Sequence, residues 1–226
     1  MDIVLQETAL LEIDPQNDFC PAYASGTGRT YPGGALAVNR GDEVIEPLNA
    51  LAARIAQGGG RVIATADWHP RGHISFASSH PGRKTGDSLD LPGVKGQILW
   101  PDHCVQGTWG AAFHEKLDLE PVNLILRKGA RVGLDSYSAF FENDRTSSTG
   151  LEGYLRGLGI KTLIIGGLAT DYCVFYTVLD ARRLGFTVFV PEDAVRGVGQ
   201  PEGSVEQALK TMAEAGVVFK KPGELL

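Results

Sequence analysis

Short apolar runs alternate with helical patterns along most of this chain, and the alternation constrains the fold more than any other feature. The runs are continuously apolar, which is typical of parallel strands covered on both faces. Strands separated by helices pair in parallel through right-handed crossovers. We therefore expect a three-layer α/β/α sandwich of the Rossmann-like type, with a central, mostly parallel sheet of about six strands. The predicted strands are Thr8–Ile13, Arg61–Ala66, Asn123–Arg127, Thr162–Ile165, Phe186–Val190 and Val217–Phe219.

Amphipathic segments between these runs predict the helices. In the first of them, Val44, Leu48, Leu51 and Ile55 share one face, and Pro47 fits the first turn. Apolar residues at helical spacing also follow the fourth strand. The predicted helices are Glu43–Gln57, Gly150–Leu158, the segment from 173 to 182, and Val205–Ala213.

Two stretches depart from the alternation. Cys20–Arg40 is rich in glycine and proline, and Pro70–Cys104 is long, mixed and without clear periodicity. A long loop inside a compact domain is uncommon and is often functional. Because no segment reads as a linker, we expect a single domain over residues 1–226, with a long functional loop at about 70–104.

Composition excludes several classes of partner. The net charge is −6 and no basic block is visible, which argues against nucleic acid and against anionic membranes. The start, MDIVLQETALL, has no basic region like that of a signal peptide, and no apolar stretch is long enough to span a bilayer. Three cysteines, an odd number, indicate reduced thiols. We expect a cytoplasmic protein that binds no nucleic acid and no membrane. The oligomeric state stays open, a homo-oligomer included.

Chemically useful residues follow four of the predicted strands. Asp14 follows the first strand, Asp67 and His69 the second, Lys128 the third, and Cys173 the fourth. Taken singly, each fits a plain structural role better than a functional one. In open parallel sheets, however, ligands bind beyond the carboxyl ends of the strands. These side chains should therefore face one crevice.

Cys173 is a candidate nucleophile. Small residues turn the chain after the fourth strand, and Thr170 and Asp171 are good helix N-cap residues, which places Cys173 in the first helical turn. Free N–H groups and the helix dipole there favour a thiolate. The alternative, a small buried cysteine that fills a gap, is about equally compatible with this stretch. Cys20 and Cys104 follow no strand-to-helix turn and are weaker candidates.

Asp67 and His69 form a candidate metal site. Two residues apart in an extended segment, their side chains point the same way. Carboxylate oxygen and imidazole nitrogen suit a divalent ion such as zinc, iron or manganese. Such a pair is a weak signal by itself, but His73 and His103 lie in the same irregular region and could complete the site.

Four segments that carry these residues resemble the nicotinamidase family of the isochorismatase-like cysteine hydrolases. The segments are DPQNDF, ADWHP, WPDHC and GLATDYC, and the resemblance runs from about Thr8 to Val195. The ADWHP and WPDHC pair is the specific part, because related amidohydrolases of this fold generally lack that metal site. The resemblance implies hydrolysis of nicotinamide to nicotinate and ammonia through a cysteine thioester, and of pyrazinamide to pyrazinoate, in NAD salvage.

The resemblance also implies residue roles. The catalytic triad would be Cys173, Asp14 and Lys128, and the N–H groups of Ala169 and Cys173 would hold the oxyanion. The Leu168–Ala169 peptide bond would be cis. The implied metal ligands are Asp67, His69 and His103, with His73 at a position that is a ligand in some members only. The aromatic residues expected at the substrate are Phe19, Trp100 and Tyr137. One divalent ion would bind the pyridine nitrogen, zinc being favoured over iron or manganese.

Two other classes of function stay open. An amidohydrolase acting on a carbamoyl or ureido substrate would keep Asp14, Lys128 and Cys173 but would not need the metal. A non-catalytic protein on the same fold would bind a metal or a thiol without turnover. Stoichiometric metal in the purified protein would distinguish a nicotinamidase from the first alternative. Release of ammonia in a turnover assay would distinguish it from the second.

Overall fold

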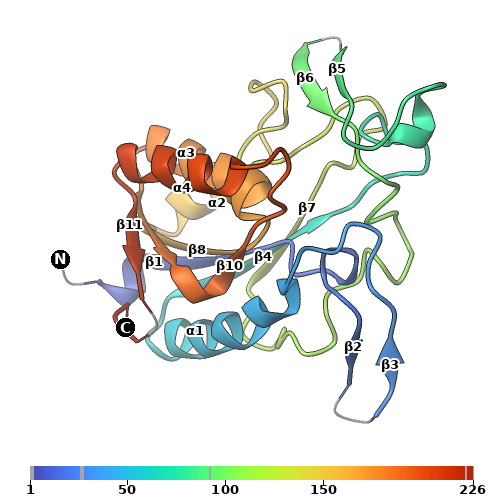
Figure 1. The fold of residues 1–226 in the computed structure, drawn as a ribbon. Coiled ribbons are helices and arrows are strands. Elements are labelled where there is room, and N and C mark those ends of the chain that lie inside the picture. Colours follow the sequence, from blue (N-terminus) through green and yellow to red (C-terminus); the bar gives the residue numbers. More distant parts are fainter. Residues whose placement is uncertain (1–2, 26–27, 92, 222, 226) are drawn as a thin grey trace.

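The computed structural model describes residues 3–25, 28–91, 93–221 and 223–225. It contains a seven-stranded, fully parallel sheet in the order β11–β9–β8–β1–β4–β7, with β10 also paired to β8 (Figure 1). The six predicted strands are confirmed, and β10 was missed because it has only two residues. The strands are β1 Thr8–Ile13, β4 Arg61–Asp67, β7 Leu124–Lys128, β8 Thr162–Leu168, β9 Thr187–Pro191, β10 Val195–Arg196 and β11 Val218–Lys220.

Helices cover both faces of this sheet and give the predicted three layers. One face is covered by α1 and the other by α2, α3 and α4 (Figure 1). The bounds are α1 Ile45–Gln57, α2 Leu151–Gly157, α3 Phe175–Arg183 and α4 Ser204–Glu214. Short 3-10 helices are η1 Leu5–Glu7, η2 Asn17–Phe19, η3 Gly41–Val44, η4 Ala77–Ser79 and η6 Glu192–Ala194. Among the described residues, no helix is both long and apolar enough to cross a membrane.

The strand β1 lies in the middle of the sheet and contributes to both cores. Ala9, Leu11 and Ile13 pack with the layer of α2, α3 and α4, whereas Leu10 packs with the layer of α1. Successive side chains of a strand point to opposite faces, so a strand covered on both sides must be apolar throughout. The continuous apolar runs that predicted the parallel sheet have this origin.

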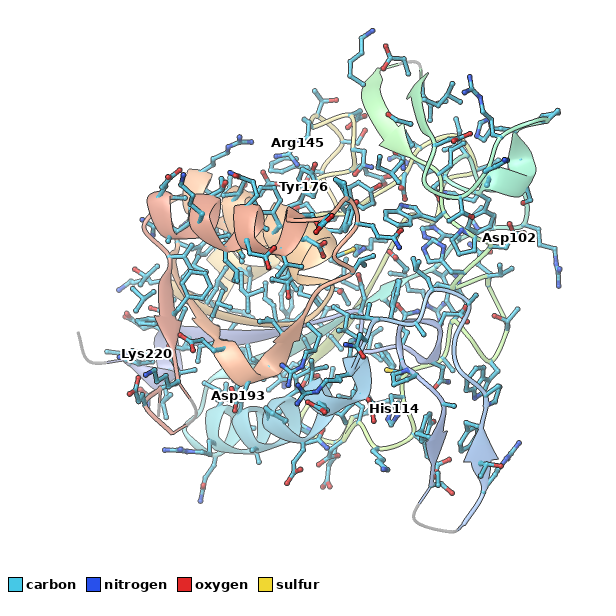
Figure 2. The ribbon with its side chains drawn as sticks, viewed as in Figure 1. Asp102, His114, Arg145, Tyr176, Asp193 and Lys220 are labelled. Atoms are coloured by element: carbon cyan, nitrogen blue, oxygen red, sulfur yellow. The ribbon has the colours of Figure 1, made fainter. Side chains whose placement is uncertain are left out.

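Two hairpins lie in the stretches that were expected to be irregular. The first pairs β2 Tyr23–Ala24 with β3 Thr30–Tyr31, and the second pairs β5 Ser88–Leu91 with β6 Val94–Ile98. Both project from the body of the molecule (Figure 1). Their strands are short, with two to five residues each, and the polar and apolar alternation of Ser88–Leu91 in β5 covers only four residues. The hairpins were therefore not predicted from the sequence. Figure 2 shows His114 at the base of the first hairpin, where its ring lies 3.9 Å from that of Tyr23.

Glu12 interrupts the apolar run of β1, and its carboxyl group is fully buried without a hydrogen-bond partner for either oxygen. Burial, followed by the charge of Asp118, raises the pKa of Glu12 from its usual 4.5 to about 8. The folded chain therefore keeps this proton up to about pH 8, whereas the unfolded chain releases it near pH 4.5. Raising the pH through this window thus favours unfolding.

We expect Glu12→Gln to stabilise the fold at pH 8 and to change little at pH 4. Each pKa unit corresponds to about 1.4 kcal/mol, so the gain at pH 8 should be on the order of a few kcal/mol. Melting temperatures at the two pH values measure it. Glu46→Gln, an exposed position on α1, is the control and should show no such dependence. The same effect of Glu12→Gln at both pH values would contradict the explanation.

Candidate active site

Four neighbouring strands bring the predicted residues to one edge of the sheet. In the order β8–β1–β4–β7, Cys173 lies beyond the end of β8 and Asp14 directly follows β1. Asp67 and Lys128 are the last residues of β4 and β7, and the two are aligned in the register. All four side chains are buried. The expected convergence at the carboxyl ends of the strands is confirmed.

Lys128 joins the other three side chains. Its Nζ lies 2.9 Å from Asp14 Oδ2, 2.5 Å from Asp67 Oδ1 and 3.3 Å from Cys173 Sγ. It also donates a hydrogen bond to the carbonyl oxygen of Ser136 at 2.9 Å. Burial alone would lower the pKa of Lys128, but Asp14 and Asp67 hold it well above its usual value. The ammonium group is therefore charged beside the thiol.

Asp14 is held in one orientation by β4. It has a φ of +47°, in the left-handed region, which turns the chain sharply after β1. Thr65 donates its hydroxyl to Asp14 Oδ1 at 2.6 Å and accepts from the Asp14 N–H at 3.1 Å. The other carboxylate oxygen, Oδ2, faces Lys128. Burial raises the pKa of Asp14 to about 6 against the opposing charge of Lys128.

Cys173 lies in a π-helical turn, η5 Thr170–Val174, and α3 starts only after it. The predicted position in the first turn of a helix after the fourth strand is confirmed, and that turn is π-helical. The N-cap residue is Ala169, and no side chain caps the turn. Asp171 instead accepts hydrogen bonds from the N–H groups of Val198 and Gly199, so it ties a distant loop to the turn. Single turns of π-helix are frequent at functional sites.

Burial of the Cys173 thiol works against the thiolate that a helix N-terminus favours. The side chain is 5% exposed, and burial raises its pKa well above the usual value. The charge of Lys128 opposes that shift only in part. Desolvation disfavours the charged form of a cysteine and here outweighs the neighbouring cation. The resting side chain is a thiol, and its reaction needs a base.

The peptide bond between Leu168 and Ala169 is cis, as the resemblance implied. Within the described part of the chain, the N–H group of Ala169 donates to no acceptor. Ala169 and Cys173 both line the pocket described below.

Asp67, His69 and His103 form a group that fits a divalent metal ion. One ligand atom from each lies within 4.8 Å of the others, and all three side chains are buried. His69 Nδ1 is 2.9 Å from the carbonyl oxygen of Gly129, and His103 Nδ1 is 2.8 Å from that of Pro101. A carbonyl oxygen only accepts, so both Nδ1 atoms carry the proton.

In the neutral form of each ring, Nε2 keeps its lone pair, and these atoms lie 3.6 and 3.9 Å from Asp67 Oδ2 for His69 and His103. Burial opposes the charged form of His69, but the charge of Asp67 raises the pKa of His69. Fixing the tautomer through the second ring nitrogen is the usual arrangement for metal-binding histidines. Burial, with the neighbouring His69, lowers the pKa of His103 to about 4. His103 is then neutral near pH 7, which is the form that binds metals. The donor set of two imidazoles and one carboxylate suits zinc, and also iron or manganese.

His73 lies beside this group without joining it. Its ring stacks on His69 with centroids 4.1 Å apart, and its nitrogens contact Ser75 Oγ at 2.7 Å and the carbonyl oxygen of Leu134 at 3.3 Å. It shares a second possible metal group with His69 and Asp135, but not the group of Asp67 and His103. His73 as a metal ligand stays a prediction.

A pocket opens over the thiol and the metal group. The three aromatic residues implied by the resemblance, Phe19, Trp100 and Tyr137, line it, and Trp100 Nε1 donates to the hydroxyl of Tyr137 at 3.1 Å. Four further lining residues were not predicted, three from segments without a sequence pattern and one, next to Cys173, from the π-helical turn. They are Leu36, Asp135, Tyr172 and Val198.

The two other cysteines are not part of this pocket. Cys20 and Cys104 are fully buried, and all three cysteines are free thiols. Burial raises the pKa of Cys20 to about 12 and that of Cys104 well above its usual value. Neither has a lysine as close as Cys173 has, so the structure favours Cys173 as the reactive thiol.

An isochorismatase domain model matches residues 8–220. Since this is most of the 226 residues, the chain belongs to the isochorismatase family. The nicotinamidase of Acinetobacter baylyi is 44% identical over 92% of this chain and 90% of its own length. The nicotinamidase of Escherichia coli is 45% identical over 93% of both chains. Within the family, the chain therefore groups with the nicotinamidases, and it is an amidohydrolase.

Solved structures of nicotinamidases and pyrazinamidases are also similar to this chain. A nicotinamidase and pyrazinamidase from Acinetobacter baumanii has a TM-score of 0.88 and 44% identity, covering 98% of this chain and 99% of its own. PnC1 from L. infantum, solved with nicotinate, has a TM-score of 0.79 and 33% identity, covering 100% and 98%. The pyrazinamidase of Pyrococcus horikoshii, solved with zinc, has a TM-score of 0.72 and 35% identity, covering 95% and 99%.

Proposed function

We propose that this chain is a one-domain enzyme that hydrolyses nicotinamide to nicotinate and ammonia, and also pyrazinamide to pyrazinoate. The observation that carries the proposal is a single pocket lined both by Cys173, whose sulfur contacts the buried Lys128–Asp14 pair, and by the metal group of Asp67 and two histidines. The identity to nicotinamidases and the nicotinate bound to a structural relative support the substrate. The nicotinate produced would serve NAD salvage.

Asp14 is the proton carrier in this proposal. Because the resting Cys173 is a thiol, its proton must leave as Sγ attacks the carboxamide carbon. Asp14 Oδ2 receives that proton, and a carboxylate with a pKa of about 6 is suited to exchange protons near neutral pH. Asp14 then delivers the proton to the nitrogen, ammonia leaves, and a thioester remains on Cys173. Water attacks the thioester and gives a proton to Asp14, which passes it to Sγ as the C–S bond breaks. Cys173 is then a thiol again, Asp14 is ionised, and nicotinic acid leaves and loses its proton to the solvent as nicotinate.

Lys128 and two backbone N–H groups stabilise charge along this path. Lys128 holds Asp14 and keeps a positive charge 3.3 Å from the sulfur that becomes negative during attack. The N–H groups of Ala169 and Cys173 would hold the carboxamide oxygen as it becomes an oxyanion, and the first of them has no other acceptor in the described chain. Donors already in place for the developing charge are usually the largest contribution to such catalysis.

Asp67, His69 and His103 would hold one divalent ion, and the zinc complex of a structural relative makes zinc the first choice over iron or manganese. When bound, this ion would supply a Lewis acid that holds the pyridine nitrogen of the substrate. Phe19, Trp100 and Tyr137 would bind the ring, and the first two are buried while Tyr137 is half-buried, so their aromatic faces would exclude water from it. This metal group weighs against the carbamoyl or ureido alternative, which would have no use for it.

Two results test the role of the metal group. Benzamide, which has the same ring without the nitrogen, should be a far poorer substrate than nicotinamide. His103→Ala should lose zinc and raise the KM for nicotinamide, while alkylation of Cys173 by iodoacetamide stays largely intact. The matched control is His80→Ala, since His80 lies outside every metal group of the described residues and contacts the carbonyl oxygen of Ile74. Equal hydrolysis of benzamide and nicotinamide by the zinc-loaded enzyme would contradict this role.

A further inference from the structure

A second carboxylate, Asp135, lies in the pocket and has no part in the mechanism above. It comes from the segment between β7 and α2, and its side chain is 3% exposed. It lines the same pocket as Asp67, His69 and His103. Moving a charged carboxylate out of water costs free energy, so buried carboxylates are usually paired with a cation, hydrogen-bonded or bound to a metal.

Asp135 is held firmly from two sides, but no cation pairs with it. Oδ2 accepts a hydrogen bond from Gln97 Nε2 of β6 at 2.8 Å, and Oδ1 accepts from the N–H group of Ser136 at 2.8 Å. Gln97 is itself buried and also contacts Asn143, so the β5–β6 hairpin supplies one of the two hydrogen bonds to this carboxylate, and the Ser136 N–H, which supplies the other, is independent of it. Figure 1 shows the hairpin. In the described ranges, no lysine or arginine forms a salt bridge with it.

The nearest groups that a cation would share with Asp135 are imidazoles. One oxygen of Asp135 and one nitrogen each of His69 and His73 lie within 4.8 Å of one another. His69 is also a member of the proposed metal group. The carboxylate of Asp135 therefore lies next to one member of the group that would hold a divalent ion.

The proton of His73 makes it a poor ligand in this arrangement. Its Nε2 lies 3.3 Å from the carbonyl oxygen of Leu134, which only accepts, so Nε2 carries the proton. Its Nδ1 then accepts the hydroxyl proton of Ser75 at 2.7 Å. The opposite tautomer would set two lone pairs against each other at Leu134. Both nitrogens of His73 are thus occupied, whereas Asp135 keeps free lone pairs.

We propose that Asp135 is a positioning residue for the metal: its charge strengthens the hold of Asp67, His69 and His103 on a divalent ion, and His73 is not a ligand. The inference rests on the proposed function, because it requires that metal site. Groups just outside the direct ligands commonly change metal affinity by about 10–100-fold. Asp135→Asn, which removes the charge at nearly unchanged shape, should weaken zinc binding by about that factor.

The experiment is a chelator competition on the zinc-loaded full chain, which gives the Kd for zinc. Gln97→Leu is the matched control, because it removes the hydrogen bond to Asp135 but leaves the charge, and its Kd should stay within a few-fold of the original. His73→Gln should likewise keep its zinc, whereas His69→Gln should lose it. Near-ultraviolet circular dichroism establishes that each variant is folded, and Asp135→Ser repeats the test if Asp135→Asn is not.

An unchanged Kd in folded Asp135→Asn would overturn the inference. Equal weakening in Gln97→Leu would also overturn it, because the effect would then come from the hydrogen-bond network and not from the charge. Zinc loss in His73→Gln as large as in His69→Gln would show that His73 is a ligand. It would refute the part of the proposal that excludes His73 from the metal ligands. A starting protein that binds no zinc at all would contradict the metal site of the proposed function itself.

Discussion

Replacing Cys173 with alanine is expected to abolish turnover of nicotinamide. The sulfur lies 3.3 Å from Lys128 and lines the pocket, and no other cysteine does either. Without the sulfur no thioester forms, and water would have to attack the carboxamide without the triad. Loss of a covalent nucleophile of this kind can cost about 10⁶-fold in kcat. The measurement is ammonia release at saturating nicotinamide, with the zinc content checked to be unchanged.

The two remaining cysteines are the controls for this prediction. Cys20→Ala and Cys104→Ala should keep most of the activity, because both thiols are fully buried and neither lines the pocket. A dead Cys104→Ala variant together with an active Cys173→Ala variant would show that the nucleophile has been assigned to the wrong residue.

Asp14→Asn is the second substitution with a large expected effect. The amide keeps the shape of the carboxylate and can still accept the hydroxyl proton of Thr65, so the local geometry should survive. It cannot take the proton of Cys173, whose high pKa makes a base necessary. General acid–base catalysis is typically worth about 10²–10⁴-fold, and kcat should fall by that factor with a smaller change in KM.

Asp90→Asn is the matched control for Asp14→Asn. Asp90 is an exposed carboxylate on β5 that pairs with Lys95, far from the strand ends in the fold, and its loss should leave kcat unchanged. A kcat for Asp14→Asn within about tenfold of the starting enzyme would be too small a loss for a proton carrier, and Asp14 would then be a structural partner of Lys128.

Much of the site could be predicted because it depends on strand ends. The apolar runs at Thr8–Ile13 and Arg61–Ala66 locate two strands within one residue, and parallel pairing brings their carboxyl ends to the same edge. Asp14, Lys128 and Cys173 could thus be grouped before any contact was known. Asp67 and Lys128 proved to be the last residues of their strands and not the first after them, since pairing between β4 and β7 extends that far.

Features that depend on tertiary packing could not be predicted. Burial raises the pKa of the Cys173 thiol, and residues far away in the sequence, such as Phe19 and Trp100, line the same pocket. A helix N-terminus does not indicate this burial. Asp135 lies in a segment without periodicity, so only the folded chain shows that it faces the pocket. The place of Thr65 at the site could have been predicted from the sequence. Thr65 precedes Asp67 by two residues in a strand, so both side chains lie on the same face.

The central claim is that the chain hydrolyses the carboxamide of nicotinamide. Its most direct test is the formation of nicotinate from nicotinamide by the zinc-loaded full chain, followed by chromatography together with released ammonia. We expect nicotinate and ammonia in equal amounts, and no release of either by Cys173→Ala. Absence of nicotinate, while a carbamoyl or ureido substrate releases ammonia under the same conditions, would contradict the account.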